Sequence, residues 1–92
     1  MLDGFLTRFD DWVDRDDPTQ DVQLAVMSWI HRLQARPHRG ADRRLDLGIL
    51  WWFAEIPETD VDGHVTMCLF QIDEVAQLVT CDQIASLRRP IT

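Results

Sequence analysis

One stretch decides the fold of this 92-residue chain: Ile-Leu-Trp-Trp-Phe-Ala-Glu-Ile, residues 49–56. It is too short and too aromatic for a helix, and its apolar character predicts a β-strand that is buried on both faces. Because successive side chains of a strand point to opposite faces, Trp51 and Trp52 cannot both contact the same neighbouring layer. We therefore expect one of the two indoles to lie on the face of the sheet that the rest of the chain leaves uncovered.

Two more strands are predicted downstream, at residues 64–72 and 77–83. A four-residue loop at 73–76 would join them as a hairpin and would place Cys68 opposite Cys81. Directly opposed residues have Cβ atoms about 4.5–5.5 Å apart, which would allow a disulfide. Two buried thiols that pack as small apolar side chains are the favoured interpretation, because the chain is acidic, poor in cysteine and begins unlike a signal peptide.

Two helices are predicted upstream, over residues 2–15 and 18–35, because apolar residues recur there every three or four positions. Asp17 is the predicted N-cap of the second helix, with Pro18 in its first turn. Residues 37–46 are expected to form a loop. The expected fold class is α+β: a single domain in which an N-terminal helical hairpin packs on a three-stranded antiparallel meander, in the order ααβββ.

The charge of the chain restricts its partners. It carries 16 Asp and Glu residues against 9 cations, all of them Arg, and its formal net charge is −7. At 46% hydrophobic residues it is too apolar for a disordered acidic tail. No apolar run approaches the roughly 18–20 residues of a membrane span. We expect a cytoplasmic protein that contacts no membrane.

A resemblance to a known family rests on the order of elements over residues 21–87. The matching segments are the helix end at 29–37, Arg43-Arg44-Leu45, Leu50-Trp51-Trp52, residues 68–73 and residues 78–81. Together they resemble the RelE/ParE toxin superfamily, whose members place two N-terminal helices against an antiparallel sheet. The family usually begins with a strand, its ribonucleases are typically basic, and their C-terminal region often supplies a Tyr or His that residues 81–92 lack. The resemblance therefore implies the fold and not the nuclease activity.

No motif points to a metal, a cofactor or a nucleophile. The three histidines, His31, His38 and His64, fit no zinc-binding spacing. The chain also lacks a glycine-rich phosphate loop and a Gly-x-Ser-x-Gly nucleophile turn. We therefore expect no cofactor, no metal site and no catalytic residue.

The strongest functional signal is aromatic. Trp51, Trp52 and Phe53 form the predicted partner-binding surface, because an exposed indole on an open sheet face is typical of a contact with another molecule. We expect a small non-enzymatic interaction protein that forms a homodimer or binds a protein partner through its sheet. An acidic inhibitor that offers Asp-rich residues 10–14 to a basic partner is one alternative.

Arginines supply the other candidate site. Arg43, Arg44, Arg88 and Arg89, joined by Arg39, would bind an anion or RNA if they gathered at one end of the sheet beside an exposed indole. A divergent ribonuclease toxin is the corresponding alternative function. The favoured interpretation is that these arginines pair with the abundant Asp side chains, because the acidic ends of the chain would repel a polyanion.

Overall fold

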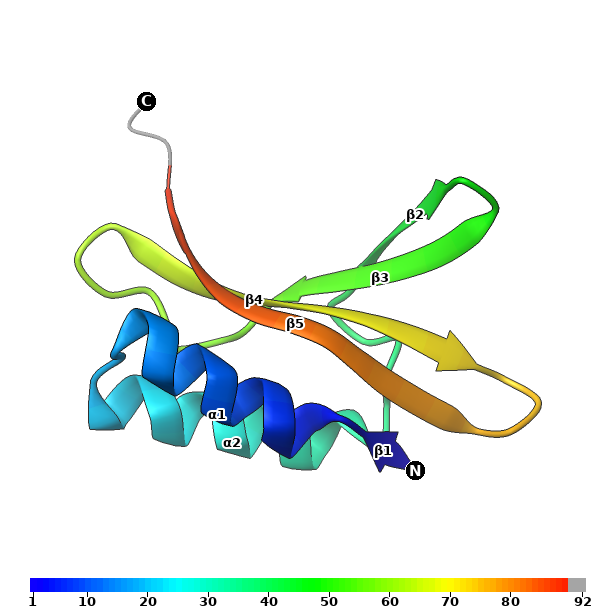
Figure 1. Ribbon diagram of the computed structural model, residues 1–92, viewed down its shortest axis with the longest axis horizontal. Helices are drawn as coiled ribbons and strands as arrows, with labels where there is room; N and C mark the ends of the chain where they lie inside the picture. Colours follow the sequence, from blue (N-terminus) through cyan, green and yellow to red (C-terminus); the bar gives the residue numbers. More distant parts are fainter. Residues whose placement is uncertain (90–92) are drawn as a thin grey trace.

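Two helices cover one face of a five-stranded mixed sheet in the computed structural model, which describes residues 1–89 (Figure 1). The elements, in chain order, are β1 (Leu2–Asp3), α1 (Phe5–Asp16), α2 (Gln20–Leu33), β2 (Asp42–Asp46), β3 (Ile49–Glu55), β4 (His64–Asp73) and β5 (Leu78–Arg88). The strand order across the sheet is β1-β5-β4-β3-β2, with β1 parallel to β5 and every other pair antiparallel. The predicted class, α+β with helices before the sheet, is confirmed, but the three expected strands are joined by two more.

The core lies between the helices and the sheet, because each helix turns one apolar stripe toward the strands. Trp12 of α1 is fully buried, and its indole Nε1 donates to Ser86 Oγ at 2.9 Å. Trp29 of α2 packs edge-to-face on Phe70 of β4, with ring centroids 6.1 Å apart. The other buried members of the core cluster are Phe5, Val22, Val26, Ile30, Leu33, Trp52, Ala54, Ile56, Cys68, Val79, Cys81 and Ile84. No helix within residues 1–89 is long and apolar enough to span a bilayer.

The chain begins with a strand and not with the predicted helix at residue 2. Leu2 and Asp3 form β1, a strand too short to show a periodic pattern. Gly4 separates β1 from α1, because its φ of +77° lies in the left-handed region, which a glycine adopts without steric strain. The helix therefore starts at Phe5.

The boundary between the helices also differs from the prediction. Asp17 does not cap the second helix. It ends α1, where its N–H donates to the carbonyl of Val13 at 3.0 Å. Thr19 is the N-cap of α2 instead, and its Oγ1 accepts from the N–H of Val22 at 3.4 Å. Thr19 satisfies one of the free N–H groups at the start of this helix, which is the role predicted for Asp17.

The predicted loop at 37–46 is wrong in its second half, because Asp42–Asp46 form β2. This segment lacks the alternation of a half-buried strand, and all five of its residues are exposed. Pairing with β3 imposes the strand, since Leu47 and Gly48 form a two-residue turn with φ values of 50° and 79°. Positive φ at both central residues is typical of the type I′ turn that closes β-hairpins.

The β4–β5 hairpin is paired two residues out of the predicted register. Asp73 Oδ1 accepts from the N–H groups of Val75 and Ala76, so the strand continues to Asp73 and the loop moves to residues 74–77. An irregularity at Leu69 and Phe70 shifts the register further along the hairpin. In consequence Cys68 lies opposite Ile84, and Cys81 lies opposite Phe70, so the predicted direct pairing of the two cysteines is wrong.

Candidate protein-interaction surface

The sheet divides into two ribbons at one end. β3 pairs with β4 only over Trp52–Glu55 and Met67–Phe70. The pairing of β2 with β3 extends past this ladder to the turn, and Figure 1 shows the β2–β3 hairpin diverging there from the β4–β5 hairpin. We call residues 42–53 the β2–β3 arm. Within residues 1–89, no third strand lies beside the end of the arm.

The end of the arm exposes aliphatic side chains on both of its faces. Leu45 is 70% exposed and Leu47 is 95% exposed, while Ile49 and Leu50 are 44% and 42% exposed. Leu45 and Leu50 are direct cross-strand partners on one face, and Ile49 lies on the other. Several aliphatic side chains exposed to water within residues 45–50 are unfavourable for an isolated chain, and contiguous apolar surface is typical of contact sites.

The three predicted aromatic residues separate between the two faces of the sheet. Trp52 is buried in the core cluster, edge-on to the ring of His38 with centroids 4.9 Å apart, and is therefore no part of an exposed surface. Trp51 and Phe53 point to the opposite face, which the helices do not cover, and both are half-buried. Phe53 lies directly across from Leu69 of β4, with Met67 two residues away. We call Trp51, Phe53, Met67 and Leu69 the open face.

Leu47 occupies a backbone position that disfavours its own side chain. Its φ of 50° lies in the left-handed region, where a Cβ is crowded at about 1–2 kcal/mol per residue. Asn, Asp and Gly are the residues that type I′ turns select. Because Leu47 is almost fully exposed, its side chain gains no packing within the chain that would offset this strain.

The chain closes one edge of its sheet and leaves the other open. Beyond the two residues of β1, the edge of β5 is met by α1: Arg15 Nη2 donates to the carbonyl of Ile84 at 2.6 Å, and Asp16 Oδ2 accepts from the N–H of Ser86 at 3.0 Å. At the opposite edge, β2 is exposed throughout and receives no such contact from residues 1–89. An open edge strand presents unpaired N–H and C=O groups to other chains.

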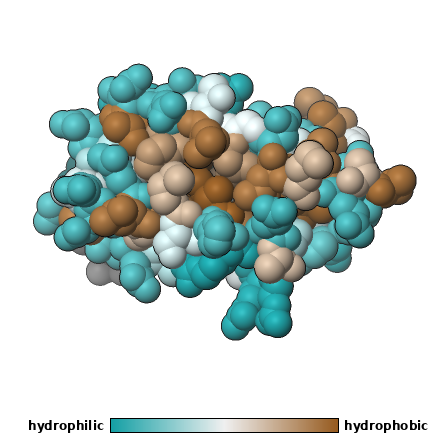
Figure 2. Space-filling view, turned by 90° about the horizontal axis from the view of Figure 1, so that it is seen from below, coloured by the Kyte–Doolittle hydropathy of each residue, from teal (hydrophilic) through white to brown (hydrophobic). Residues whose placement is uncertain are grey.

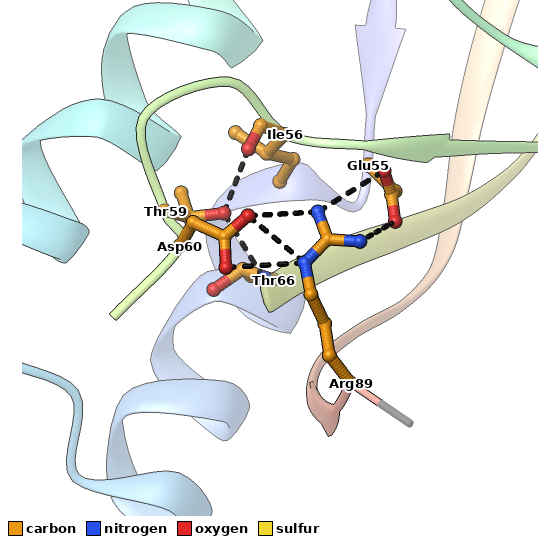
Figure 3. A network of polar contacts seen from close by, with 6 residues as sticks. All are labelled: Glu55, Ile56, Thr59, Asp60, Thr66 and Arg89. Carbon is orange, nitrogen blue, oxygen red and sulfur yellow. Dashed lines mark hydrogen bonds and ion pairs between the residues drawn. The ribbon is translucent and has the colours of Figure 1, made fainter. Parts of the chain in front are cut away.

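The arginines predicted to gather lie in different places. Arg43 and Arg44 point to opposite faces of β2, and Arg88 ends β5. Arg89 binds two carboxylates (Figure 3): its Nε donates to Asp60 Oδ2 at 2.9 Å, and its Nη1 donates to Glu55 Oε1 at 3.0 Å. The hydrogen bonds to Asp60 and then to Glu55 raise the pKa of Arg89. Arg89 thus joins the end of β5 to the β3–β4 connection.

Next to the ion pairs of Arg89, the buried hydroxyl group of Thr59 fixes the connection between β3 and β4 (Figure 3). Thr59 Oγ1 donates to the carbonyl of Ile56 at 2.7 Å and accepts from the N–H of Thr66 at 3.0 Å. Thr59 and Thr66 are both buried, so these bonds satisfy backbone groups that water does not reach.

A different group of arginines borders a cleft at the end of α2. Arg32, in the last turn of α2, and Arg36, three residues beyond its end, lie with Arg39 around this cleft of about 530 Å³. Trp29, Leu33, Ala35, Gly40, Glu55 and Pro57 complete its lining. No ion pair to these three arginines is found within residues 1–89. Arg39 is one of the arginines predicted to gather, whereas Arg32 and Arg36 are not. The position of these two cations near the C-terminus of α2 is favourable for the helix dipole.

The helical face carries apolar surface of its own. Figure 2 shows hydrophobic residues gathered in the middle of this face, with hydrophilic residues around them. The exposed apolar residues of the helices are Leu6, Leu24 and Met27. They provide matched controls for the β2–β3 arm, since Leu24 at 61% is nearly as exposed as Leu45 at 70% but lies in α2, outside the arm.

Sequence reasoning did not identify the leucines of the arm. Leu45 and Leu47 lie in a polar segment that carried no strand signal, and only the exposure of the folded hairpin distinguishes them. Within residues 1–89, no group of three or more His, Cys, Asp or Glu side chains is placed to hold a metal ion. Comparisons of this chain with protein-family models, with curated proteins and with solved structures find no match.

Proposed function

We propose that this protein is a non-enzymatic protein-interaction module that binds through the β2–β3 arm and the adjoining open face. The observation that carries the proposal is the exposure of Leu45, Leu47 and Leu50 on a hairpin that extends past the third strand. Full burial of one such side chain against a partner contributes about 1.5–3 kcal/mol, so three of them supply a substantial part of a specific interface.

The open face lies on the other side of the hairpin from Leu45 and Leu50, and it adds aromatic surface to the proposed binding site. Trp51 and Phe53 are large rigid side chains that fix few rotatable bonds on binding, and such aromatic residues are enriched in interfaces. They lie on the face away from the helices, continuous with Ile49 along β3. A partner on the open face would therefore contact Ile49 together with the two aromatic residues, while Leu45 and Leu50 lie on the opposite face of the hairpin.

Site-specific photocrosslinking tests this proposal. A benzoylphenylalanine replaces Leu47 in one variant and Leu24 in another, and both variants are irradiated in cells of the organism that makes the protein. We expect a discrete adduct from position 47, whose protein component is identified by mass spectrometry, and none from position 24. No adduct from position 47, or the same adducts from both positions, would contradict the proposed surface.

RNA binding is a second candidate function, with one supporting observation: Arg32, Arg36 and Arg39 surround a cleft that contains Trp29. Arg side chains in a groove bind single-stranded nucleic acid through its backbone phosphates, while Trp29, which is only 7% exposed, lines the base of the cleft. If all three bind phosphates, replacing them with Gln makes the negative slope of log affinity against log salt concentration shallower by about two. The Arg88→Gln variant is the control, and an absence of binding to an RNA oligonucleotide at low salt rejects this function.

A further inference from the structure

The free edge of β2 exposes a defined set of backbone groups. In a two-residue hairpin the residues that flank the turn exchange both of their backbone hydrogen bonds, and hydrogen-bonded and non-hydrogen-bonded pairs alternate from there. Asp46 and Arg44 therefore direct their N–H and C=O groups toward β3. The backbone groups of Arg43 and Leu45 point outward, where no residue of the described chain meets them.

A second copy of β2 can pair with this edge around a two-fold axis in three ways, centred on residue 43, 44 or 45. In each of them the N–H and C=O groups that point away from β3 in one copy meet the corresponding groups of the other. Centring on Arg44 places Arg44 opposite Arg44 and Asp42 opposite Asp46. Centring on Arg43 places Arg43 opposite Arg43 on the axis, although Asp42 of each copy then lies opposite Arg44 of the other. Both arrangements oppose like charges directly, which destabilises a strand pair.

The third arrangement opposes unlike charges. With Leu45 on the axis, Arg44 of each copy lies directly opposite Asp46 of the other, and Leu45 lies opposite Leu45. The two Leu45 side chains then continue the cross-strand pairs with Leu50, so a row of four leucines crosses the axis on one face. Charged residues usually protect an edge strand from pairing, but the order of charges in β2 favours one self-pairing.

We infer that the partner of the arm is a second copy of this chain, joined through antiparallel pairing of the two β2 strands about Leu45 to form one continuous sheet. This inference rests on the proposed function, since it identifies the occupant of the same surface. The closed edge at β5, where Arg15 and Asp16 bind the backbone, leaves β2 as the edge through which two sheets can join.

Charge exchange tests the register. Arg44→Asp places two carboxylates opposite each other at both symmetry-related positions, and Asp46→Arg places two guanidinium groups there. We expect each single variant to weaken dimerisation about tenfold and the double variant, Arg44→Asp with Asp46→Arg, to restore it. Sedimentation equilibrium at about 0.15 M salt measures this, because salt screens the repulsion between two chains of net charge −7. Equal affinities in all four proteins would overturn the Leu45-centred register.

Cysteine crosslinking tests the geometry independently of the charges. The Cα atoms of a hydrogen-bonded antiparallel pair lie about 5.5 Å apart, within the range that a disulfide spans. We expect Leu45→Cys to give a crosslinked dimer on mild oxidation, while Val75→Cys, on the β4–β5 turn, does not, although Val75 at 97% is more exposed than Leu45 at 70%. The native cysteines are buried, so they do not compete. Equal crosslinking at both positions would contradict the pairing.

The outcomes separate the two proposals. A wild-type chain that remains at its monomer mass of 10.7 kDa up to about 1 mM overturns the dimer. If position 47 then crosslinks to a different protein, the arm is still a binding surface and only its occupant is wrong. If the chain is monomeric and position 47 gives no adduct, both proposals fail. Circular dichroism of each variant confirms that the exposed substitutions leave the fold intact.

Discussion

The thiols of Cys68 and Cys81 lie 3.7 Å apart, Sγ to Sγ, inside the core, and they are not bonded to each other. The strand register places them diagonally, because Cys81 lies opposite Phe70 and Cys68 lies two residues along β4 from Phe70. The hydrogen bond with Cys81, and then burial, raise the pKa of Cys68 far above its ordinary value of 9.0. The folded protein therefore keeps this thiol protonated in alkaline solution.

The first prediction concerns stability at high pH. Because the folded pKa of Cys68 is raised, the unfolded chain releases this proton above pH 9 while the folded chain retains it. The free energy of unfolding is then unaffected below pH 9 and falls above it, by about 1.4 kcal/mol per pH unit for one proton. Urea unfolding between pH 8 and 11 measures the slope. The chain has no Lys and no Tyr to titrate there, and a Cys68→Ala/Cys81→Ala variant with the same slope would contradict the assignment.

The second prediction compares two glycines with similar backbones. Gly4 and Gly40 have φ values of 77° and 74°, so replacing either with Ala introduces left-handed strain of about 1–2 kcal/mol. A Cβ at Gly4 would also lie 3.3 Å from the carbonyl oxygen of Cys81, while Gly40 has open space. We expect Gly4→Ala to lower the free energy of unfolding more than Gly40→Ala does, measured by urea titration. Equal losses would show that the contact of Gly4 with β5 carries no constraint.

The third prediction concerns the buried hydroxyl of Thr59. Thr59→Val keeps the shape of the side chain but leaves the Ile56 carbonyl and the Thr66 N–H without their partner. We expect a loss of about 1–3 kcal/mol in the free energy of unfolding, since both backbone groups are buried. Thr7→Val, on the exposed face of α1, is the matched control and should change stability by less than about 0.5 kcal/mol. Similar effects of the two substitutions would contradict the role of Thr59.

The fourth prediction separates folding from binding at the turn of the arm. Leu47→Asn relieves the left-handed strain at a position with no packing to lose, so the free energy of unfolding should rise by up to about 1 kcal/mol. The same change removes an exposed aliphatic side chain from the proposed surface and should weaken association. Leu24→Asn, within α2, should instead lower stability and leave association unchanged. A Leu47→Asn variant that is less stable than the wild type would refute the strain at this turn.

Periodicity was sufficient to predict the helices and the three central strands, because these segments pack against the core and their apolar spacing reflects it. It could not predict β2, since residues 42–46 are exposed and become a strand only by pairing with β3 across a Leu-Gly turn. It also missed β1, whose two residues are held by β5. For the candidate surface, alternation correctly separated Trp51 from Trp52 but did not show which indole faces the core. The exposed leucines of the arm depend on where the β3–β4 ladder ends, which no local pattern records.

Amide hydrogen exchange at Leu45 tests the central claim most directly, because its N–H points away from β3 at the free edge of β2. If two copies pair there, the Leu45 amide becomes protected as the protein concentration rises, while the amides of Arg44 and Asp46, already bonded to β3, keep the same exchange rates. If the Leu45 amide exchanges as fast as an unstructured peptide at every concentration, the edge is unoccupied and the proposed dimer does not form.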